Sequence, residues 1–156
     1  MSTHYQGTET EKLALEVYIK LSRAAEVVET RINHHLKDYN LTLSQFGVLE
    51  ALYHLGPLHQ YELAAKVLKS SGNLTLVIDN LAKRGLVERD RDATDRRCLT
   101  IGLTEAGRQL VSAMFPSHVG YVVEAMDVLT AAEQQQLAAL CRQLGLAQKK
   151  SNGGLQ

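Results

Sequence analysis

A charged segment near the middle of the sequence has side chains that could bind the phosphate backbone of nucleic acid. Arginines and aspartates are mixed there: Arg89, Asp90, Arg91, Asp92, Asp95, Arg96 and Arg97. Guanidinium groups suit a narrow minor groove, because its enhanced negative potential attracts them without base-specific hydrogen bonds. The same mixture is equally typical of a solvated loop whose charges neutralise one another. Taken alone, the segment favours the solvated loop.

A second segment, upstream of the arginines, could contact base edges. Leu74, Ile78 and Leu81 recur at the spacing of one helical face, so residues about two positions away from them should point outward. These outward residues, with the serine that precedes them, are Ser70, Ser71, Gly72, Asn73, Thr75, Leu76 and Asn80. An asparagine can pair with adenine, a threonine can bond to a base or a phosphate, and a leucine can touch the thymine methyl group. The alternative is a polar first turn that only caps a helix.

Histidines and cysteines form no recognisable catalytic or metal-binding pattern. The histidines show no HExxH or comparable spacing, and the adjacent His34 and His35 should point to different sides of a helix. Cys98 and Cys141 lie far apart and belong to no CxxC pair, so neither a disulfide framework nor a zinc ribbon is indicated. We therefore expect a protein that is not an enzyme and that uses no cofactor and no metal.

The segments that must position these side chains are mostly helical in pattern. From Glu9 to Asp38 apolar residues recur at helical spacing, which predicts one long amphipathic helix. Such a helix is hard to bury within a small body, so we expect part of its apolar stripe to pack against another chain. The alternative is a helix that folds wholly onto its own domain.

A capping pattern predicts where the next helix begins. Thr42 can cap it while Gln45 reaches back, and Leu41 can pack against Phe46 as a hydrophobic staple. This helix should run to about Leu55.

Turn residues divide the segment that follows. Gly56-Pro57 should end the helix, and a short helix is predicted from about Gln60 to Val67. The helix that carries the outward polar residues should be capped by Ser70 or Ser71 and should end at Gly85, which supplies a left-handed stop.

The period then changes to that of strands. Leu86–Arg89 and Cys98–Leu103 alternate between apolar and polar residues, which predicts a β-hairpin with the charged segment at its tip. Thr104 should cap another long helix, and Pro116 should kink that helix near its middle.

The last predicted helix opens with a second capping box. Thr130 and Glu133 have the required spacing, and the apolar pattern continues to about Leu146. The remaining residues, 148–156, are rich in Lys, Ser, Asn and Gly and should be disordered.

Composition limits the class of protein. Lys and Arg together number 17, as do Asp and Glu, so any contact with DNA must depend on a local patch rather than on net charge. Abundant Leu and Ala with only two prolines favour a mainly α fold with a small β-hairpin. The polar N-terminus and the acids Glu124 and Asp127 within the most apolar stretch indicate no export signal and no membrane span, so we expect a cytoplasmic protein.

The order of these elements is typical of a winged helix-turn-helix. In such a domain the capped helix enters the major groove of double-stranded DNA and the hairpin, or wing, lies along the backbone. The sequence from Leu41 to Arg108 resembles the MarR (multiple antibiotic resistance regulator) family of transcription regulators, through LTLSQFGVLEALYHLGPLHQYELAAKV and SSGNLTLVIDNLAKRGLVERDRDATDRRCLTIGLTEAGR.

This resemblance implies a homodimer. It assigns residues 9–40 to an N-terminal dimerisation helix, 41–103 to the winged helix-turn-helix lobe, 104–147 to C-terminal dimerisation helices and 148–156 to a tail. Two recognition helices about one DNA turn apart would bind a pseudo-palindromic operator. The expected output is repression by occlusion, relieved by a small-molecule effector.

The resemblance also assigns roles to single residues. The family uses an Asp-x-Arg pair at the wing tip, in which the Asp braces the Arg that enters the minor groove; here these are Asp95 and Arg97. Arg89, Arg91 and Arg96 complete the expected wing contacts. Leu76 departs from the family, many members of which carry Arg or another polar residue there, so the preferred bases do not follow from the resemblance.

An effector cavity is expected where the dimerisation helices meet the DNA-binding lobe. In the family it often takes small aromatic or phenolic anions. By matching position, its lining would include Arg23, Val27, Phe46, Leu49, Tyr53 and Leu110. Each of these residues is as easily explained as ordinary core or surface.

Two alternative functions stay open. A redox-responsive regulator could act through Cys98, although the peroxide-sensing branch of the family uses a cysteine near the start of its first long helix, and none precedes Cys98 here. A winged helix can also serve as a protein-interaction module without sequence-specific DNA binding. Zinc sensing is not supported, because Phe46 and Gly47 stand where the zinc-sensing branch carries a Glu-His pair.

Overall fold

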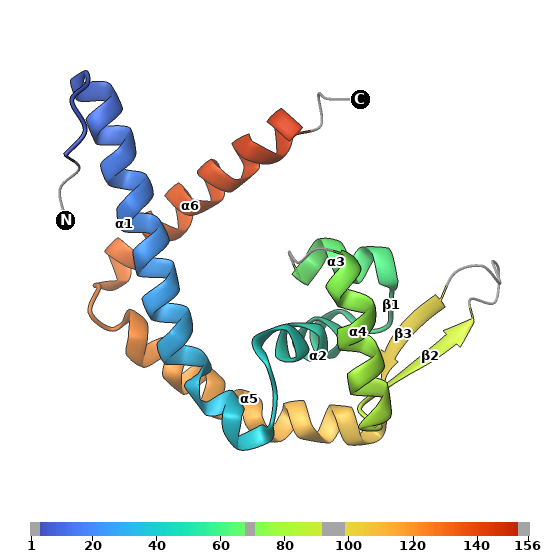
Figure 1. The fold of residues 1–156 in the computed structure, drawn as a ribbon. Helices are drawn as coiled ribbons and strands as arrows, with labels where there is room; N and C mark the ends of the chain where they lie inside the picture. The colour runs from blue at the N-terminus through green and yellow to red at the C-terminus, as the bar shows by residue number, and fades with distance from the viewer. Residues whose placement is uncertain (1–3, 68–70, 92–98, 153–156) are drawn as a thin grey trace. The chain divides into compact units, whose positions relative to one another are not determined.

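The computed structural model describes residues 4–67, 71–91 and 99–152, which form a mainly helical fold with one small sheet (Figure 1). The chain divides into two compact units, Met1–Val119 and Gly120–Gln156, each considered by itself. The elements are α1 (Glu9–Ile32), η1 (Asn33–Tyr39), α2 (Leu43–Leu55), β1 (Leu58–His59), α3 (Gln60–Val67), α4 (Ser71–Lys83), β2 (Val87–Arg91), β3 (Leu99–Leu103), α5 (Glu105–Met126) and α6 (Ala131–Asn152). The fold class expected from the sequence is confirmed.

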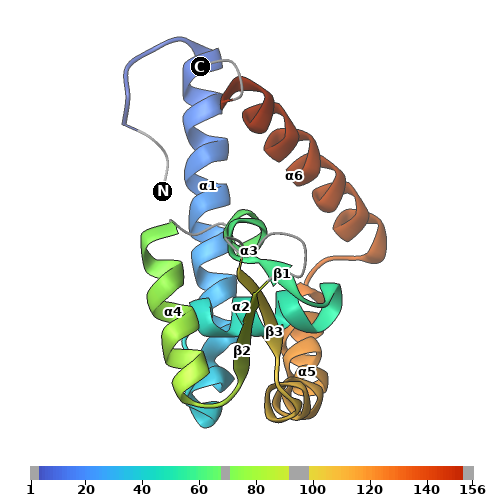
Figure 2. The same cartoon turned by 90° about the vertical axis from the view of Figure 1, so that its right-hand side faces the viewer.

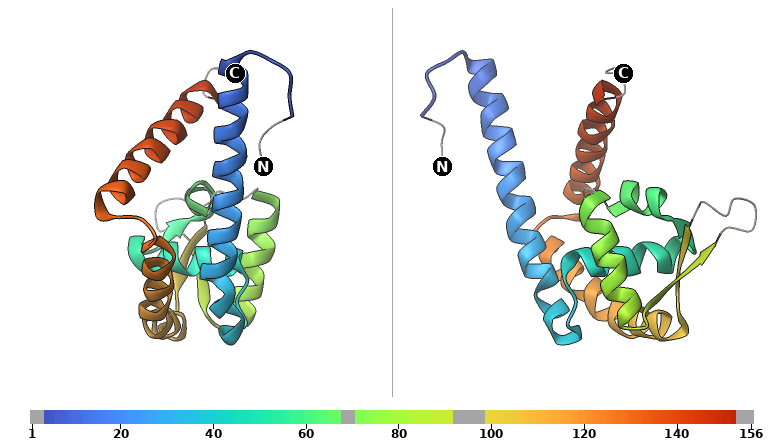
Figure 3. Two further views of the ribbon diagram at one scale, coloured as in Figure 1. Left: turned by 90° about the vertical axis from the view of Figure 1, so that its left-hand side faces the viewer. Right: turned by 45° about the vertical axis from the view of Figure 1, so that its right-hand side comes forward.

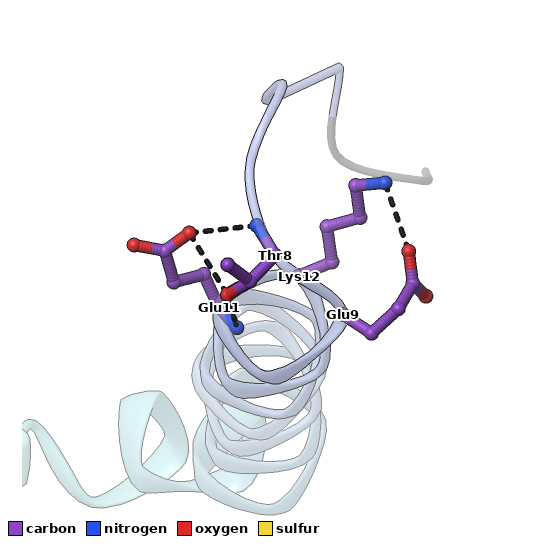
Figure 4. Close-up of polar contacts among 4 residues, drawn as sticks. All are labelled: Thr8, Glu9, Glu11 and Lys12. Atoms are coloured by element: carbon purple, nitrogen blue, oxygen red, sulfur yellow. Dashed lines mark hydrogen bonds and ion pairs between the residues drawn. The ribbon is translucent and has the colours of Figure 1, made fainter.

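Helix α1 begins at a capping box that gives side-chain acceptors to free backbone N–H groups of the first turn. The backbone N–H of Thr8 donates to Glu11 Oε2 (2.8 Å), and that of Glu11 donates to Thr8 Oγ1 (3.3 Å; Figure 4). The hydrogen bond from the Thr8 backbone, followed by the one from its hydroxyl, lowers the pKa of the Glu11 carboxyl group. Lys12 forms an ion pair with Glu9 in the same turn (3.0 Å).

The segment predicted as one helix from Glu9 to Asp38 changes its geometry before it ends. The α-helical part stops at Ile32 and continues as the 3-10 helix η1. The side-chain Nδ2 of Asn33 donates to the backbone carbonyl of Glu29 (2.8 Å), and Asn40 ends the segment with a left-handed φ of 51°. An apolar period cannot separate α from 3-10 geometry over so short a stretch, because their repeats of about 3.6 and about 3.0 residues per turn diverge slowly.

Helix α2 begins and ends where the sequence predicts. The Thr42 N–H donates to Gln45 Oε1 (3.1 Å), and the Gln45 N–H donates to Thr42 Oγ1 (3.2 Å). Leu41 and Phe46 are both buried in the same core, as a hydrophobic staple requires. Gly56 ends the helix with a φ of 78°, which a residue with a side chain rarely adopts.

One cluster of buried apolar side chains joins α2, α3 and α4 to the sheet and to α5. Its fully buried members are Val48, Leu49, Leu52, Leu63, Ile78, Leu81, Ile101, Val111 and Met114. The short helix α3 has the predicted bounds, and α4 ends before Gly85, whose left-handed φ of 67° confirms the predicted stop. The cap predicted at Ser70 lies outside the described residues. This core fixes one face of α4 and leaves the other for a different contact.

The sheet has three antiparallel strands in the order β1-β3-β2 (Figure 2). Strands β2 and β3 form the predicted hairpin, which projects from the helices (Figure 3). Strand β1 was not predicted; in it Leu58 pairs with Ile101 and His59 pairs with Thr100. A strand of two residues is too short to show alternation, so its sequence carries no signal of pairing.

The start of α5 is tied to the end of α4. The Thr104 hydroxyl donates to the carbonyl of Gly85 (2.6 Å) and accepts from the N–H of Gly107 (3.1 Å), which confirms the predicted cap. A Cβ on Gly107 would lie 2.0 Å from the carbonyl oxygen of Leu86, so this position has no room for a side chain. Pro116 lies inside α5, which is helical across it, and the predicted kink stays a prediction.

The second unit contains the end of α5 and all of α6. The predicted capping box is confirmed, because the Thr130 N–H donates to Glu133 Oε2 (2.8 Å) and the Glu133 N–H donates to Thr130 Oγ1 (3.4 Å). Helix α6 runs to Asn152, beyond the expected end near Leu146, so residues 148–152 of the expected tail are helical. Among the described helices, none is both long enough and apolar enough to cross a membrane.

Candidate DNA interface

Helix α4 has one buried face and one exposed face. Leu74, Ile78 and Leu81 are at most 2% exposed, as the sequence predicts for the core side. On the other side, Thr75 is exposed and Leu76 is 59% exposed, while Asn80 is half-buried. An exposed leucine flanked by polar residues on a well-packed helix is a surface suited to contact with base edges.

A side chain from α3 reaches the exposed face of α4. Gln60, the first residue of α3, donates a hydrogen bond from Nε2 to the Thr75 hydroxyl oxygen (2.8 Å). Gln60 itself is held at the start of its helix by a cap, in which the His59 N–H donates to Glu62 Oε2 (2.8 Å). The two helices of the helix-turn-helix are therefore joined by a polar contact at the surface as well as by their shared core.

The C-terminal end of α4 is held by an arginine. Arg84 donates from one guanidinium nitrogen to the carbonyl of Asn40 (2.7 Å) and from the other to the carbonyl of Tyr39 (3.1 Å). These carbonyls lie at the end of η1, where unpaired acceptors and the helix dipole favour a cation. The contact ties the end of α4 to the segment that follows α1.

Strand β2 is linked to α4 by an ion pair between Arg89 and Asp79. The exposed fractions of the two side chains are 28% and 42%, so the pair is only partly shielded from water. Arg89 was expected to contact DNA; in the structure its guanidinium group bonds to the recognition helix. Because a guanidinium carries five N–H donors, this ion pair leaves others for a phosphate. Arg91, at the end of β2, is exposed.

Several expected contact residues lie outside the part of the chain that the structure describes. Ser70, Asp95, Arg96 and Arg97 lie outside the described residues, as does Cys98. Ser71, Gly72 and Asn73 form the first turn of α4, of which the structure describes the backbone alone. Their roles in DNA binding remain predictions.

Comparisons with known proteins decide the family. The profile of the MarR family matches residues 41–99. The regulator MhqR of Bacillus subtilis, described as an HTH-type transcriptional regulator, is 34% identical over 141 residues, which cover 90% of this chain and 97% of that protein. The chain belongs to the MarR family. It is accordingly a DNA-binding transcriptional regulator, and the interaction-module alternative is set aside.

Solved structures agree with the assignment to the MarR family. Sco3205 from Streptomyces coelicolor, a MarR family regulator in complex with DNA, is 27% identical with a TM-score of 0.78; the match covers 90% of this chain and 92% of that one. BpsR of Bordetella bronchiseptica is 28% identical with a TM-score of 0.76, covering 83% of this chain and 98% of that one. Its structure is described as explaining regulation of DNA binding by 6-hydroxynicotinic acid.

Three residues that position α4 or its side chains were missed by sequence reasoning: Gln60, Asp79 and Arg84. Each contacts another element of the fold. Gln60 bonds to Thr75, Asp79 pairs with Arg89, and Arg84 bonds to a carbonyl at the end of η1. For Arg84 a signal was present, because a basic residue beside the left-handed Gly85 suits the end of a helix. Nothing local to Gln60 or Asp79 indicates a partner.

The expected effector-pocket residues differ in their surroundings. Phe46 and Leu49 belong to the buried core, Tyr53 and Leu110 pack against it, and Arg23 and Val27 are exposed. A pocket of about 410 Å³ is lined by Tyr53, Glu105, Arg108, Gln109, Ser112 and Ala113. Another, of about 430 Å³, is lined by parts of α1, α2 and α3 that include Glu29, Glu50, His54 and Lys66. Of the six expected residues, Tyr53 lines one of these two pockets.

Aromatic rings and imidazoles gather between η1, α2 and α5. The ring of His118 lies 4.5 Å from that of Phe46 and 5.3 Å from that of His35, measured between centroids. His35 is buried, with Nδ1 2.7 Å from the carbonyl of Ile32. Burial and then the neighbouring His35 lower the pKa of His118, so its neutral form is favoured. Within the described part of the chain, no three His, Cys, Asp or Glu residues lie where they could share a metal ion.

Proposed function

We propose that this MarR-family regulator is a dimeric repressor that binds a pseudo-palindromic operator and is released by a small aromatic or phenolic anion. The observation that carries the DNA-binding mode is the exposed face of α4 with Thr75 and Leu76, opposite a face that is fully packed. The wing residues Arg91, Asp95, Arg96 and Arg97 would lie along the DNA backbone, with Arg97 in the minor groove. Ser71, Gly72, Asn73 and Asn80 of α4, with the preceding Ser70, would complete the contact.

The dimer is supported by apolar side chains that each unit leaves uncovered. On α1 these are Leu13, Val17, Tyr18 and Leu21, and on α6 they are Leu137, Leu140 and Leu144. Apolar stripes of this kind on long helices are typical of surfaces that a second copy of the chain covers. Two copies would also supply the two recognition helices that a palindrome needs.

The effector class is supported by a relative and by one pocket. Binding of DNA by BpsR is regulated by 6-hydroxynicotinic acid, an aromatic carboxylate. Here Tyr53 lines a pocket that also contains Arg108 and Gln109, which can donate hydrogen bonds to a carboxylate or phenolate. Glu105 accepts a hydrogen bond from Gln109 in the same pocket (3.0 Å), which holds that amide in place.

Selection from a random duplex library with the full-length protein tests the DNA-binding mode. We expect an enriched inverted repeat with half-sites about one helical turn apart, and an affinity whose logarithm falls steeply with the logarithm of salt concentration. Enrichment of unrelated sequences, or a single half-site bound as tightly as the repeat, would contradict the proposal. Release of the selected duplex by 6-hydroxynicotinic acid or by salicylate, and not by cyclohexanecarboxylate, would support the aromatic effector.

A further inference from the structure

The contact between Gln60 and Thr75 constrains the hydrogen of the threonine hydroxyl. A hydroxyl group has one donor hydrogen and two acceptor lone pairs, and a glutamine Nε2 can only donate. Since Nε2 of Gln60 lies 2.8 Å from the Thr75 oxygen, one lone pair is occupied and the hydroxyl hydrogen must point elsewhere. Thr75 stands on the exposed face of α4, so an acceptor on DNA is available to that hydrogen once α4 lies in the major groove.

The backbone at Gln60 is held by contacts of the residues on either side of it. The preceding residues Leu58 and His59 pair with β3, and the His59 N–H donates to the Glu62 carboxylate of the same helix. Gln60 is itself half-buried, which restricts its side chain further. With the start of α3 held in this way, the amide of Gln60 stays within reach of the Thr75 hydroxyl, to which its Nε2 donates.

We propose that Gln60 is a specificity-determining residue: by donating to Thr75, it makes Thr75 a hydrogen-bond donor to the DNA and selects a base that presents an acceptor in the major groove. Guanine N7 and O6, adenine N7 and thymine O4 are such acceptors, whereas the exocyclic amines of cytosine and adenine are donors. Gln60 acts through Thr75 and is a positioning residue in this respect. The inference rests on the proposed function, in which α4 lies in the major groove.

Exchanging the amide for a carboxylate gives the sharpest test. In Gln60→Glu the side chain can only accept, so the Thr75 hydroxyl should turn its hydrogen toward the new carboxylate and present a lone pair to the DNA. We expect the preferred base at one position of each half-site to change from one with an acceptor to one with a donor. The added negative charge lowers affinity for all sequences, and normalising each base-substitution profile to its best duplex removes that effect.

Further variants separate a specificity role from a purely structural one. Gln60→Ala should lower the preference at the same base pair by roughly 2- to 10-fold, the range expected for one net hydrogen bond. Thr75→Val should remove that preference, and Thr75→Ser, which keeps the hydroxyl, should retain it. Gln135→Glu, the same substitution at an exposed position of α6, is the matched control and should leave the profile unchanged.

The outcomes distinguish this inference from the proposed function. If Thr75→Val changes the profile and both Gln60 variants leave it as in the wild type, the inference is overturned while α4 remains the recognition helix. If the Gln60 variants weaken all duplexes equally with no change at any base, Gln60 is only structural and the inference is again overturned. If the wild-type protein selects no sequence at all, the proposed function fails, and the inference fails with it.

Discussion

The arginines around α4 have different partners and therefore different tasks. Arg84 donates to two backbone carbonyls at the end of η1, and Arg89 is paired with Asp79, so both guanidinium groups hold the recognition helix in place. Arg91 is exposed on β2. Arg97 has its expected role only through the resemblance to the family. Substitution of these residues should therefore separate effects on folding from effects on DNA binding.

Arg97→Ala should weaken operator binding by roughly 1–3 kcal/mol and reduce the salt dependence of the affinity, because a cation close to phosphates is lost. The free energy of unfolding in urea should stay at the wild-type value. Arg84→Ala is the matched comparison: it should lower the free energy of unfolding by about 1 kcal/mol, because two hydrogen bonds to carbonyls are lost. Fluorescence anisotropy at fixed salt and urea titration measure the two quantities. Equal affinity of Arg97→Ala and wild type would remove Arg97 from the interface.

His118 should make the stability of the protein depend on pH. Burial, and then His35, lower its pKa in the folded state, so on acidification the unfolded chain takes up a proton at this residue first. The free energy of unfolding should therefore fall as the pH drops below about 6.5, the ordinary pKa of histidine. His118→Gln should flatten this fall, and His34→Gln, at an exposed position of the neighbouring η1, should not. Identical pH profiles for wild type and His118→Gln in urea titrations would contradict the assignment.

At the scale of elements, signals within a few residues predict most boundaries. The capping pairs Thr42 with Gln45 and Thr130 with Glu133 each begin a helix where expected, and Gly85 ends α4 with the expected left-handed backbone. Strand β1 and the change from α1 to η1 were missed, because neither leaves a periodic pattern of its own. The tie between Gln60 and Thr75 was missed for a different reason: a local pattern gives the spacing within an element and not the partner on another one.

Gly107→Ala tests the close approach at the start of α5. The new Cβ would meet the Leu86 carbonyl oxygen at 2.0 Å, and backbone on both sides must move to relieve the clash. We expect a loss of about 1–3 kcal/mol in the free energy of unfolding, typical of an overpacked site. Gly120→Ala, in the same helix with nothing within 4 Å of the added methyl, is the control and should stabilise by up to about 1 kcal/mol through helix propensity. Equal effects of the two substitutions in urea titrations would refute this account.

At the scale of the whole molecule, a net charge of zero and a wing in which arginines are mixed with acidic residues describe a protein that cannot hold DNA by overall charge. In the proposed dimer each recognition helix makes few contacts with DNA, and one helix alone would bind weakly. Linking two such helices raises the affinity for a palindrome, because the second half-site binds at the high effective concentration set by the first. The proposed dimer would connect the exposed apolar stripes of α1 and α6 to the function of α4.

Leu140→Glu should weaken the dimer and, with it, binding to the full palindrome. Leu140 belongs to the exposed stripe of α6 with Leu137 and Leu144, and a carboxylate placed in an apolar interface would lose its hydration without a partner. Leu146 is exposed on the opposite side of the same helix, so Leu146→Glu introduces the same charge outside the stripe. Light scattering at micromolar concentration should give a lower mass for Leu140→Glu and an unchanged mass for Leu146→Glu.

DNA binding supplies the second measurement for these variants. A duplex with a single half-site needs only one recognition helix, so Leu140→Glu should bind it as the wild type does, while its affinity for the full palindrome falls toward the half-site value. That pattern would separate loss of the dimer from loss of the fold, because an unfolded variant would bind neither duplex. If Leu140→Glu keeps both the wild-type mass and the wild-type affinity for the palindrome, this stripe of α6 is not part of the dimer interface. If the wild-type protein is itself a stable monomer that binds the palindrome tightly, two linked recognition helices are not the source of its affinity.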